Sequence, residues 1–123
     1  MDNVYELYRN GTRLLEDGDY HAAAVPLMRA RDLEPDKTSI REALGRAYFR
    51  CGRFPAAGTE FARAVEIDPV NDYAHFGLGL ALQRVGDLSG ARRHLKLAVA
   101  MRPLDDYRRA LEQVAAVPQG AGS

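Results

Sequence analysis

The sequence predicts an all-α solenoid, a row of helices stacked along one axis, and three observations support this prediction. First, residues of the same type recur every 34 positions, three times over. Second, apolar residues within each unit are spaced as on one face of a helix, as at Ile40, Leu44, Ala47 and Tyr48. Third, no segment shows the alternation of period two that is typical of a strand, so we expect no sheet.

Five positions of the repeat hold the same residue in all three units. They are Gly11, Gly45 and Gly79; Gly18, Gly52 and Gly86; Ala23, Ala57 and Ala91; Ala30, Ala64 and Ala98; and Pro35, Pro69 and Pro103. The first glycine and the two alanines allow two helices to approach to about 8 Å. The second glycine supplies the positive φ that ends the first helix, and the proline stops the second helix. The pattern therefore predicts that each unit consists of a helix, a tight turn, a second helix and a loop.

Large apolar residues also follow the 34-residue period, and short polar residues stand near the predicted start of each unit. Four positions after each alanine of the first set stands a large apolar residue that we expect to fill the space between units: Leu27, Phe61 and Leu95. Short polar residues mark the predicted helix starts, at Asn3 with Glu6, at Ser39 with Glu42, at Asp72, and at Asp105 or Asp106.

This pattern resembles the tetratricopeptide repeat (TPR), in which Leu-Gly, an aromatic residue, Ala, an aromatic residue, Ala and Pro follow in fixed order. The second unit carries the fullest set, namely Leu44, Gly45, Tyr48, Ala57, Phe61, Ala64 and Pro69. The resemblance covers about 102 of the 123 residues. It implies a right-handed α-α superhelix, the TPR solenoid, and it is specific for the fold rather than for the ligand.

We expect one TPR domain over residues 1–117, with repeats at 4–37, 38–71 and 72–105. A further amphipathic segment at 105–117 predicts a seventh helix, which would cap the open end of the solenoid with a polar outer face. Residues 118–123 lack large apolar side chains, so we expect a disordered tail.

Two residues of the first unit depart from the pattern. Asn10 stands where the family has leucine, which predicts an amide at a core position that needs a partner. Pro26 falls inside the second helix, where it removes one backbone hydrogen bond and is expected to bend the helix.

Composition argues against several classes of protein. Seventeen basic and 17 acidic residues cancel, whereas binding of nucleic acid or of an anionic membrane requires a basic surplus. No apolar run approaches the length of a membrane span. The single cysteine, Cys51, excludes an internal disulfide and favours a reducing compartment. We therefore predict a cytoplasmic protein, and the abundance of arginine and alanine hints at a bacterial source.

No group of residues predicts catalysis, a metal or a cofactor. His21, His75 and His94 occupy three different offsets of the repeat, so no helical metal pair is indicated, and His75 is interpreted as a packing residue. Cys51 at a helix C-terminus would have a disfavoured thiolate. Gly77 and Gly79 lie inside a predicted helix and follow no strand, so they form no phosphate loop. We expect no enzymatic activity.

The resemblance implies that the first helix of each unit lines a concave groove. The groove positions that we predict to bind a peptide are Tyr5, Tyr8, Glu42, Arg46, Phe49, Arg50, Tyr73, Phe76, Leu80 and Arg84. The capping helix would add Tyr107 and Ala110. Exposed aromatic residues and arginine are favoured at binding hot spots.

The charges of the predicted groove are expected to cancel in part. Glu42 and Arg46 are four residues apart on one helix and would pair, and Glu16 would pair with Arg50, which leaves Arg84 as the free cation. One TPR subgroup grips a C-terminal carboxylate through lysine, asparagine and arginine. The corresponding positions carry no cation or amide in this chain, being Tyr8, Thr12, Ala43, Tyr73 and Gly77. We therefore predict no recognition of that type.

The leading functional hypothesis is an adaptor that binds an apolar peptide segment of a partner protein, with a possible acidic group, in the groove. Two alternatives remain open. An apolar edge around Val4, Tyr5 and Pro26 would allow self-assembly into a homo-oligomer, and the chain would also suit a chaperone-like holder of a secreted or membrane-bound partner.

Overall fold

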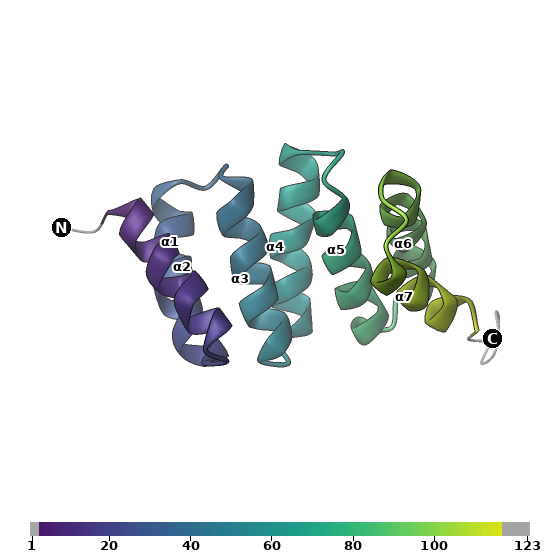
Figure 1. The fold of residues 1–123 in the computed structure, drawn as a ribbon, viewed down its shortest axis with the longest axis horizontal. Coiled ribbons are helices and arrows are strands. Elements are labelled where there is room, and N and C mark those ends of the chain that lie inside the picture. Colours follow the sequence, from purple (N-terminus) through teal and green to yellow (C-terminus); the bar gives the residue numbers. More distant parts are fainter. Residues whose placement is uncertain (1–2, 117–123) are drawn as a thin grey trace.

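A computed structural model describes residues 3–116, which form seven α-helices stacked side by side (Figure 1). They are α1 (Val4–Glu16), α2 (Tyr20–Leu33), α3 (Thr38–Arg50), α4 (Phe54–Ile67), α5 (Asp72–Val85), α6 (Leu88–Met101) and α7 (Asp105–Ala115). The described residues contain no strand, so the predicted all-α class is confirmed. None of these helices is long and apolar enough to cross a membrane. The tail predicted at 118–123 lies outside the described residues.

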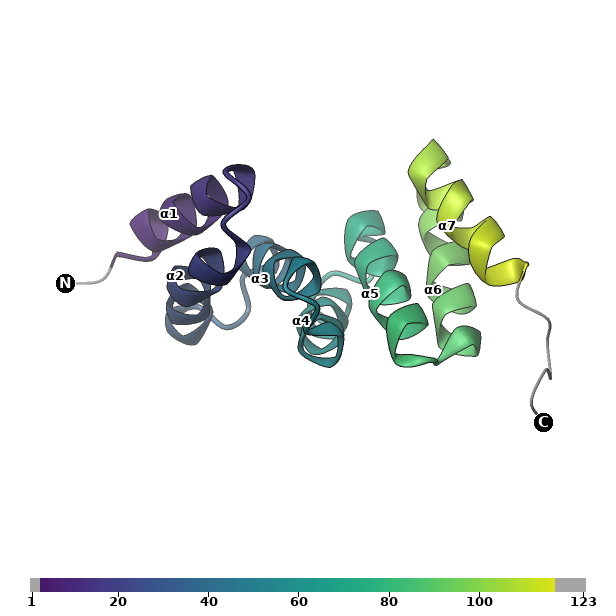
Figure 2. The same ribbon diagram turned by 90° about the horizontal axis from the view of Figure 1, so that it is seen from below.

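The helices form antiparallel pairs, α1 with α2, α3 with α4 and α5 with α6, and α7 packs on α6 at the far end (Figure 2). The odd-numbered helices also contact each other, α1 with α3, α3 with α5 and α5 with α7. Within the described chain the even-numbered helices make no such contacts with each other. The stack is therefore tighter on the side of the odd-numbered helices, which makes that side the inner one.

The turns inside the three pairs use the predicted glycines. Gly18, Gly52 and Gly86 have φ values of 81°, 79° and 93°, a region that side chains disfavour. The predicted helix start at Asn3 is correct: this residue caps α1, and its Oδ1 accepts from the backbone N–H of Tyr5 at 2.8 Å. Helices α5 and α7 begin at Asp72 and Asp105 as predicted, although the capping residues are Asn71 and Leu104, and α3 begins at Thr38, one residue before the predicted Ser39.

Large side chains of the even-numbered helices sit on glycines of the odd-numbered ones. Phe61 on α4 lies between two of them: a Cβ built on Gly45 would lie 2.9 Å from its ring, and one built on Gly77 would lie 2.5 Å from it. Leu95 packs on Gly79 in the same way: a Cβ built on Gly79 would lie 2.7 Å from the leucine side chain. The predicted close approach of the helices through small residues is therefore present, and the phenylalanine requires two glycines where leucine requires one.

The departures in the first unit have different outcomes. Asn10 is exposed, so the prediction of a buried amide is wrong. Its counterpart Leu44 is buried because α2 covers it, whereas no helix among the described residues precedes α1. Pro26 is accommodated within α2, which continues to Leu33.

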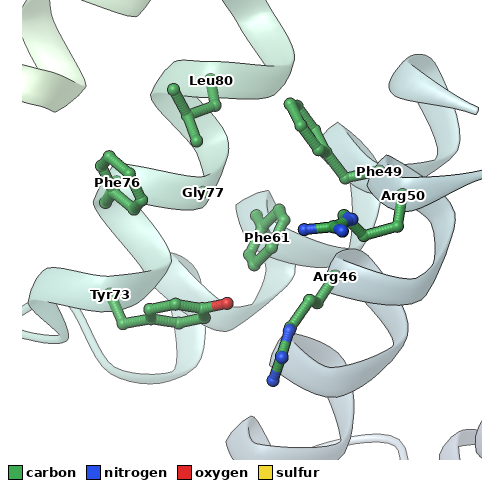
Figure 3. A pocket seen from close by; sticks show the side chains of 8 residues that line it. All are labelled: Arg46, Phe49, Arg50, Phe61, Tyr73, Phe76, Gly77 and Leu80. Atoms are coloured by element: carbon green, nitrogen blue, oxygen red, sulfur yellow. The ribbon is translucent and has the colours of Figure 1, made fainter. Parts of the chain in front are cut away.

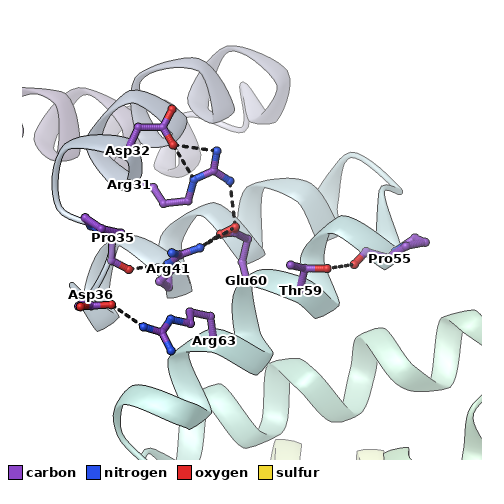
Figure 4. A network of polar contacts seen from close by, with 9 residues as sticks. All are labelled: Arg31, Asp32, Pro35, Asp36, Arg41, Pro55, Thr59, Glu60 and Arg63. Carbon is purple, nitrogen blue, oxygen red and sulfur yellow. Dashed lines mark hydrogen bonds and ion pairs between the residues drawn. The ribbon is translucent and has the colours of Figure 1, made fainter.

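A buried carboxylate joins the first two units on the outer side (Figure 4). Glu60 is 2% exposed and accepts hydrogen bonds from Arg41 at 2.8 Å and from Arg31 at 3.0 Å. Arg41 also donates through Nε to the backbone oxygen of Pro35 at 2.9 Å. The charge is thus paired on both oxygens, as a buried carboxylate requires.

The third unit places two histidines at the same repeat positions, 34 residues after Arg41 and Glu60. Nε2 of His75 lies 2.8 Å from the backbone oxygen of Pro69, so this nitrogen carries the proton and donates it. Nδ1 of His75 then accepts from Nδ1 of His94, 3.0 Å away. This pair was not predicted, because the two histidines are 19 residues apart and lie on different helices.

Gly77→Ala is expected to lower the free energy of unfolding by about 1 kcal/mol, because overpacking against Phe61 outweighs the gain in helix propensity. Gly58→Ala is the control: its Cβ would have 3.6 Å to its nearest neighbour, so this variant should be slightly more stable. Urea denaturation measures both.

In the double variant Phe61→Leu, Gly77→Ala, the free energy of unfolding should fall by less than the sum of the losses in the two single variants. This double variant copies the preceding boundary, where Leu27 and Ala43 stand at the equivalent positions and share one core cluster. Strictly additive effects of the two substitutions would contradict the proposed seating of Phe61.

The histidine pair predicts a loss of stability in acid. Burial, with repulsion from His75 and Arg93, holds the pKa of His94 below its ordinary value of 6.5, and Asp87 opposes this only in part. The unfolded chain therefore takes up a proton at a higher pH than the folded one. The contribution of His94 is fully present above about pH 6.5 and is lost as the pH falls through the lower, folded pKa.

We expect His75→Arg, His94→Glu, which copies the Arg41–Glu60 pair, to lose less stability than the native chain between pH 7 and pH 5. Thermal unfolding at several pH values gives the comparison. An equal loss in both proteins would exclude the histidine pair as the source.

Candidate functional site

The inner side of the stack carries three adjoining depressions. The first, here called the aromatic pocket, has a volume of about 180 Å³ and is lined by Arg46, Phe49, Arg50, Phe61, Tyr73, Phe76, Gly77 and Leu80 (Figure 3). The central pocket, about 290 Å³, is lined by Tyr8, Thr12, Leu15, Ser39, Glu42, Ala43, Arg46 and Tyr73. The terminal pocket, about 340 Å³, is lined by Val4, Tyr5, Tyr8, Glu34, Lys37, Ser39 and Ile40.

Shared side chains make the three pockets one groove. Arg46 and Tyr73 line both the aromatic and the central pocket. Tyr8 and Ser39 line both the central and the terminal pocket. The groove therefore runs across α1, α3 and α5, whose contacts with one another place them on the inner side.

Helical spacing on α5 builds one wall of the aromatic pocket. Tyr73, Phe76 and Leu80 lie three and four residues apart, which puts them on one face of the helix. Gly77 lies on the same face and has no side chain, so the ring of Phe61 on α4 reaches the pocket as its floor. The rings of Phe61 and Tyr73 meet edge to face, with centroids 6.1 Å apart.

The predicted placement of Tyr107 and Ala110 in the groove is wrong. Both side chains are buried, at 5% and 6% exposure. The Tyr107 ring stacks on Phe76 at 4.5 Å, and its hydroxyl donates to Asp72 at 2.7 Å. Burial and this hydrogen bond raise the pKa of Tyr107 well above its ordinary value. Tyr107 therefore holds Phe76 in place from behind.

The arginines of the groove have partners that differ from the predicted ones. Arg50 donates to the hydroxyl of Tyr20 at 2.6 Å and lies over the tyrosine ring. Arg50 therefore bonds Tyr20 and does not form the predicted pair with Glu16. Arg84, predicted as the free cation, lies over the rings of Phe49 and Phe54 at 5.5 and 4.9 Å. It is absent from the lining of all three pockets.

Glu42 also departs from its predicted partner. Its carboxylate accepts a hydrogen bond from the side-chain amide of Asn71, which caps α5, and it forms no ion pair with Arg46. Burial, with repulsion from Asp68 and Asp72, raises the pKa of Glu42 above its ordinary value. Arg46 is exposed and makes no hydrogen bond or ion pair with any residue in the described part of the chain.

Nine of the ten predicted site residues thus line the groove, and Arg84 lies beside it. The sequence interpretation assigned Phe61 to the core alone, and it did not foresee the part that Gly77 plays in opening the pocket floor. The signal available for both was the exchange of Leu27 and Ala43 for Phe61 and Gly77 one repeat later. Over residues 3–116, no three side chains of the metal-binding types converge on one point.

This chain matches known proteins in two comparisons, one with family models and one with solved structures. The family model described as TPR repeat matches residues 45–86. A search of curated proteins found no match.

Several solved structures have the same fold. The first TPR domain of Spaghetti (RPAP3), bound to the HSP90 peptide SRMEEVD, has a TM-score of 0.87 at 19% identity, over 91% of this chain and 90% of that chain. The Yersinia enterocolitica type III secretion chaperone SycD, in complex with a peptide of the translocator YopD, has a TM-score of 0.83 at 18% identity, over 94% of each chain. MamA from Desulfovibrio magneticus RS-1 has a TM-score of 0.86 at 22% identity, over 91% of this chain and 64% of that chain.

At these identities the solved structures show a shared fold. Together with the family match over the centre of the chain, they bear out the resemblance that the glycine, alanine and proline pattern predicted. The described residues therefore have the fold of these TPR domains, with three helical pairs followed by a capping helix, and residues 45–86 match the TPR repeat model.

Proposed function

We propose that this protein is an interaction module that binds a segment of a partner protein in its concave groove. The observation that carries the proposal is the continuous row of three pockets on the inner side, walled by half-buried aromatic side chains. Tyr73 and Phe76 are held in place by neighbouring rings, so they offer contact area at a small entropic cost.

Two of the structurally similar proteins support this proposal, since RPAP3 and SycD were both solved with peptides. The partner's chemistry is expected to differ from that of the HSP90 peptide, because the carboxylate-binding positions of this chain hold no cation or amide. We propose an apolar segment with a possible acidic group, bound with about micromolar affinity because the interface is small. A chaperone-like holder of a secreted or membrane-bound protein is a form of the same function.

The remaining expectations follow from the same features. We propose a non-enzymatic protein of the bacterial cytoplasm that binds neither nucleic acid nor membrane and requires no cofactor. Balanced charge and the single cysteine support this placement.

Self-assembly is the second candidate, and one observation favours it. Tyr5 is 65% exposed at the rim of the terminal pocket, beside Val4, where a second copy could cover it. Light scattering over a range of concentrations decides this: a monomer at all concentrations would exclude a homo-oligomeric role.

The double variant Tyr73→Ala, Phe76→Ala tests the groove. Random displayed peptides selected on the native protein should bind this variant at least tenfold more weakly, because its main contact surface is lost. The matched control is Val25→Ala, Leu97→Ala, which removes two exposed apolar side chains on α2 and α6, outside the groove. Fluorescence polarisation measures binding, and circular dichroism checks the fold. Equal binding to the native protein and the groove variant would refute the proposal.

A further inference from the structure

The chemistry of the groove changes along its length. The terminal pocket offers Val4, Tyr5 and Ile40, and the aromatic pocket offers phenylalanines and Leu80. Between them, the central pocket offers mainly polar side chains, those of Thr12, Ser39, Glu42 and Arg46. The order along the groove is therefore apolar, polar, apolar, and a segment that fills all three pockets must match it.

Arg46 is the cation in this groove that has no partner of its own. Arg50 is engaged by Tyr20, and Lys37 in the terminal pocket lies 3.7 Å from Glu34. Glu42, the nearest predicted partner of Arg46, is turned to Asn71. A guanidinium without an internal partner, at the junction of the central and aromatic pockets, is suited to a carboxylate on the ligand, which it can bind through two parallel hydrogen bonds.

Three hydroxyls of the central pocket are also without hydrogen bonds within residues 3–116, those of Tyr8, Ser39 and Tyr73. An extended peptide has backbone N–H and C=O groups that need partners, whereas a helix satisfies its own. The hydroxyls can supply those partners. The central pocket therefore favours an extended segment over a helical one.

The position of Arg46 also bears on the source of the carboxylate. Pockets continue on both sides of this residue, the aromatic pocket on one side and the central and terminal pockets on the other. A ligand that ended at Arg46 would leave one side empty. A side-chain carboxylate inside the segment allows both sides to be filled.

We propose that the groove recognises an extended internal segment in which two large apolar side chains flank an aspartate or glutamate. One apolar side chain occupies the terminal pocket, the other occupies the aromatic pocket, and Arg46 binds the carboxylate between them. This proposal rests on the proposed function and adds to it the order of the ligand's residues and the residue that reads its charge.

The test is a peptide-display selection in which the carboxyl end of every peptide is fused to the carrier, so that no free terminus is present. On the native protein we expect enrichment of large apolar residues on both sides of an acidic one. On Arg46→Glu we expect the two apolar positions to persist while the central preference changes to lysine or arginine. Arg13→Glu, an equal change of charge on α1 outside the three pockets, should keep the acidic preference.

A synthetic peptide of the selected sequence gives the magnitude. Replacing its acidic residue by lysine should weaken binding to the native protein by about fivefold to tenfold and strengthen binding to Arg46→Glu. Arg46→Lys should retain the acidic preference.

The outcomes separate this inference from the proposed function. Two outcomes would overturn the inference and leave the groove function standing, both with peptides that depend on Tyr73 and Phe76. In one, the peptides show no acidic preference; in the other, they show the same acidic preference on Arg46→Glu as on the native protein. Peptides that bind only with a free carboxyl terminus would also overturn it. If no selected peptide depends on Tyr73 and Phe76, both proposals fall.

Discussion

The structure depends on the seating of one large side chain between two glycines. Phe61 packs on Gly45 of α3 and on Gly77 of α5, so a single residue of α4 fixes two odd-numbered helices relative to each other. This contact keeps α3 and α5 close on the inner side, where Phe61 then forms the pocket floor. The same residue that holds the second and third repeats together thus also shapes the surface that we propose for binding. Packing and function share one constraint.

The repeat reuses its positions with different chemistry. The place held by Arg41 and Glu60 in the second unit is held by His75 and His94 in the third, and each pair also bonds the carbonyl of the preceding proline. One joint carries an ion pair, and the other carries two hydrogen-bonded imidazoles, in which burial lowers the pKa of His94. The inner surface shows the same variation: equivalent offsets give hydroxyls, an arginine or an aromatic ring, so the groove is not uniform along its length.

Most of the fold was predictable because a 34-residue period of small residues leaves few ways for helices to pack. The groove faces of α1, α3 and α5 were predictable from the resemblance together with helical spacing, whereas that of α7 was not, because Tyr107 and Ala110 are buried. The partners of long polar side chains were not, because they depend on distances between helices: Arg50 reaches Tyr20, and Glu42 meets Asn71, across about 30 residues of chain. For the same reason Asn10 was misjudged, since its burial depends on a helix packed in front of α1, and the described residues contain none.

The central claim is that the inner side formed by α1, α3 and α5 is the binding surface, and fluorine NMR with 3-fluorotyrosine tests it directly. The probes would report from the groove, at Tyr8 and Tyr73, and from the core, at Tyr48, where Arg53 lies over the ring. On titration with a bound peptide, we expect the Tyr8 and Tyr73 resonances to shift while that of Tyr48 stays in place. Shifts at Tyr48 with none at Tyr8 and Tyr73 would contradict the account.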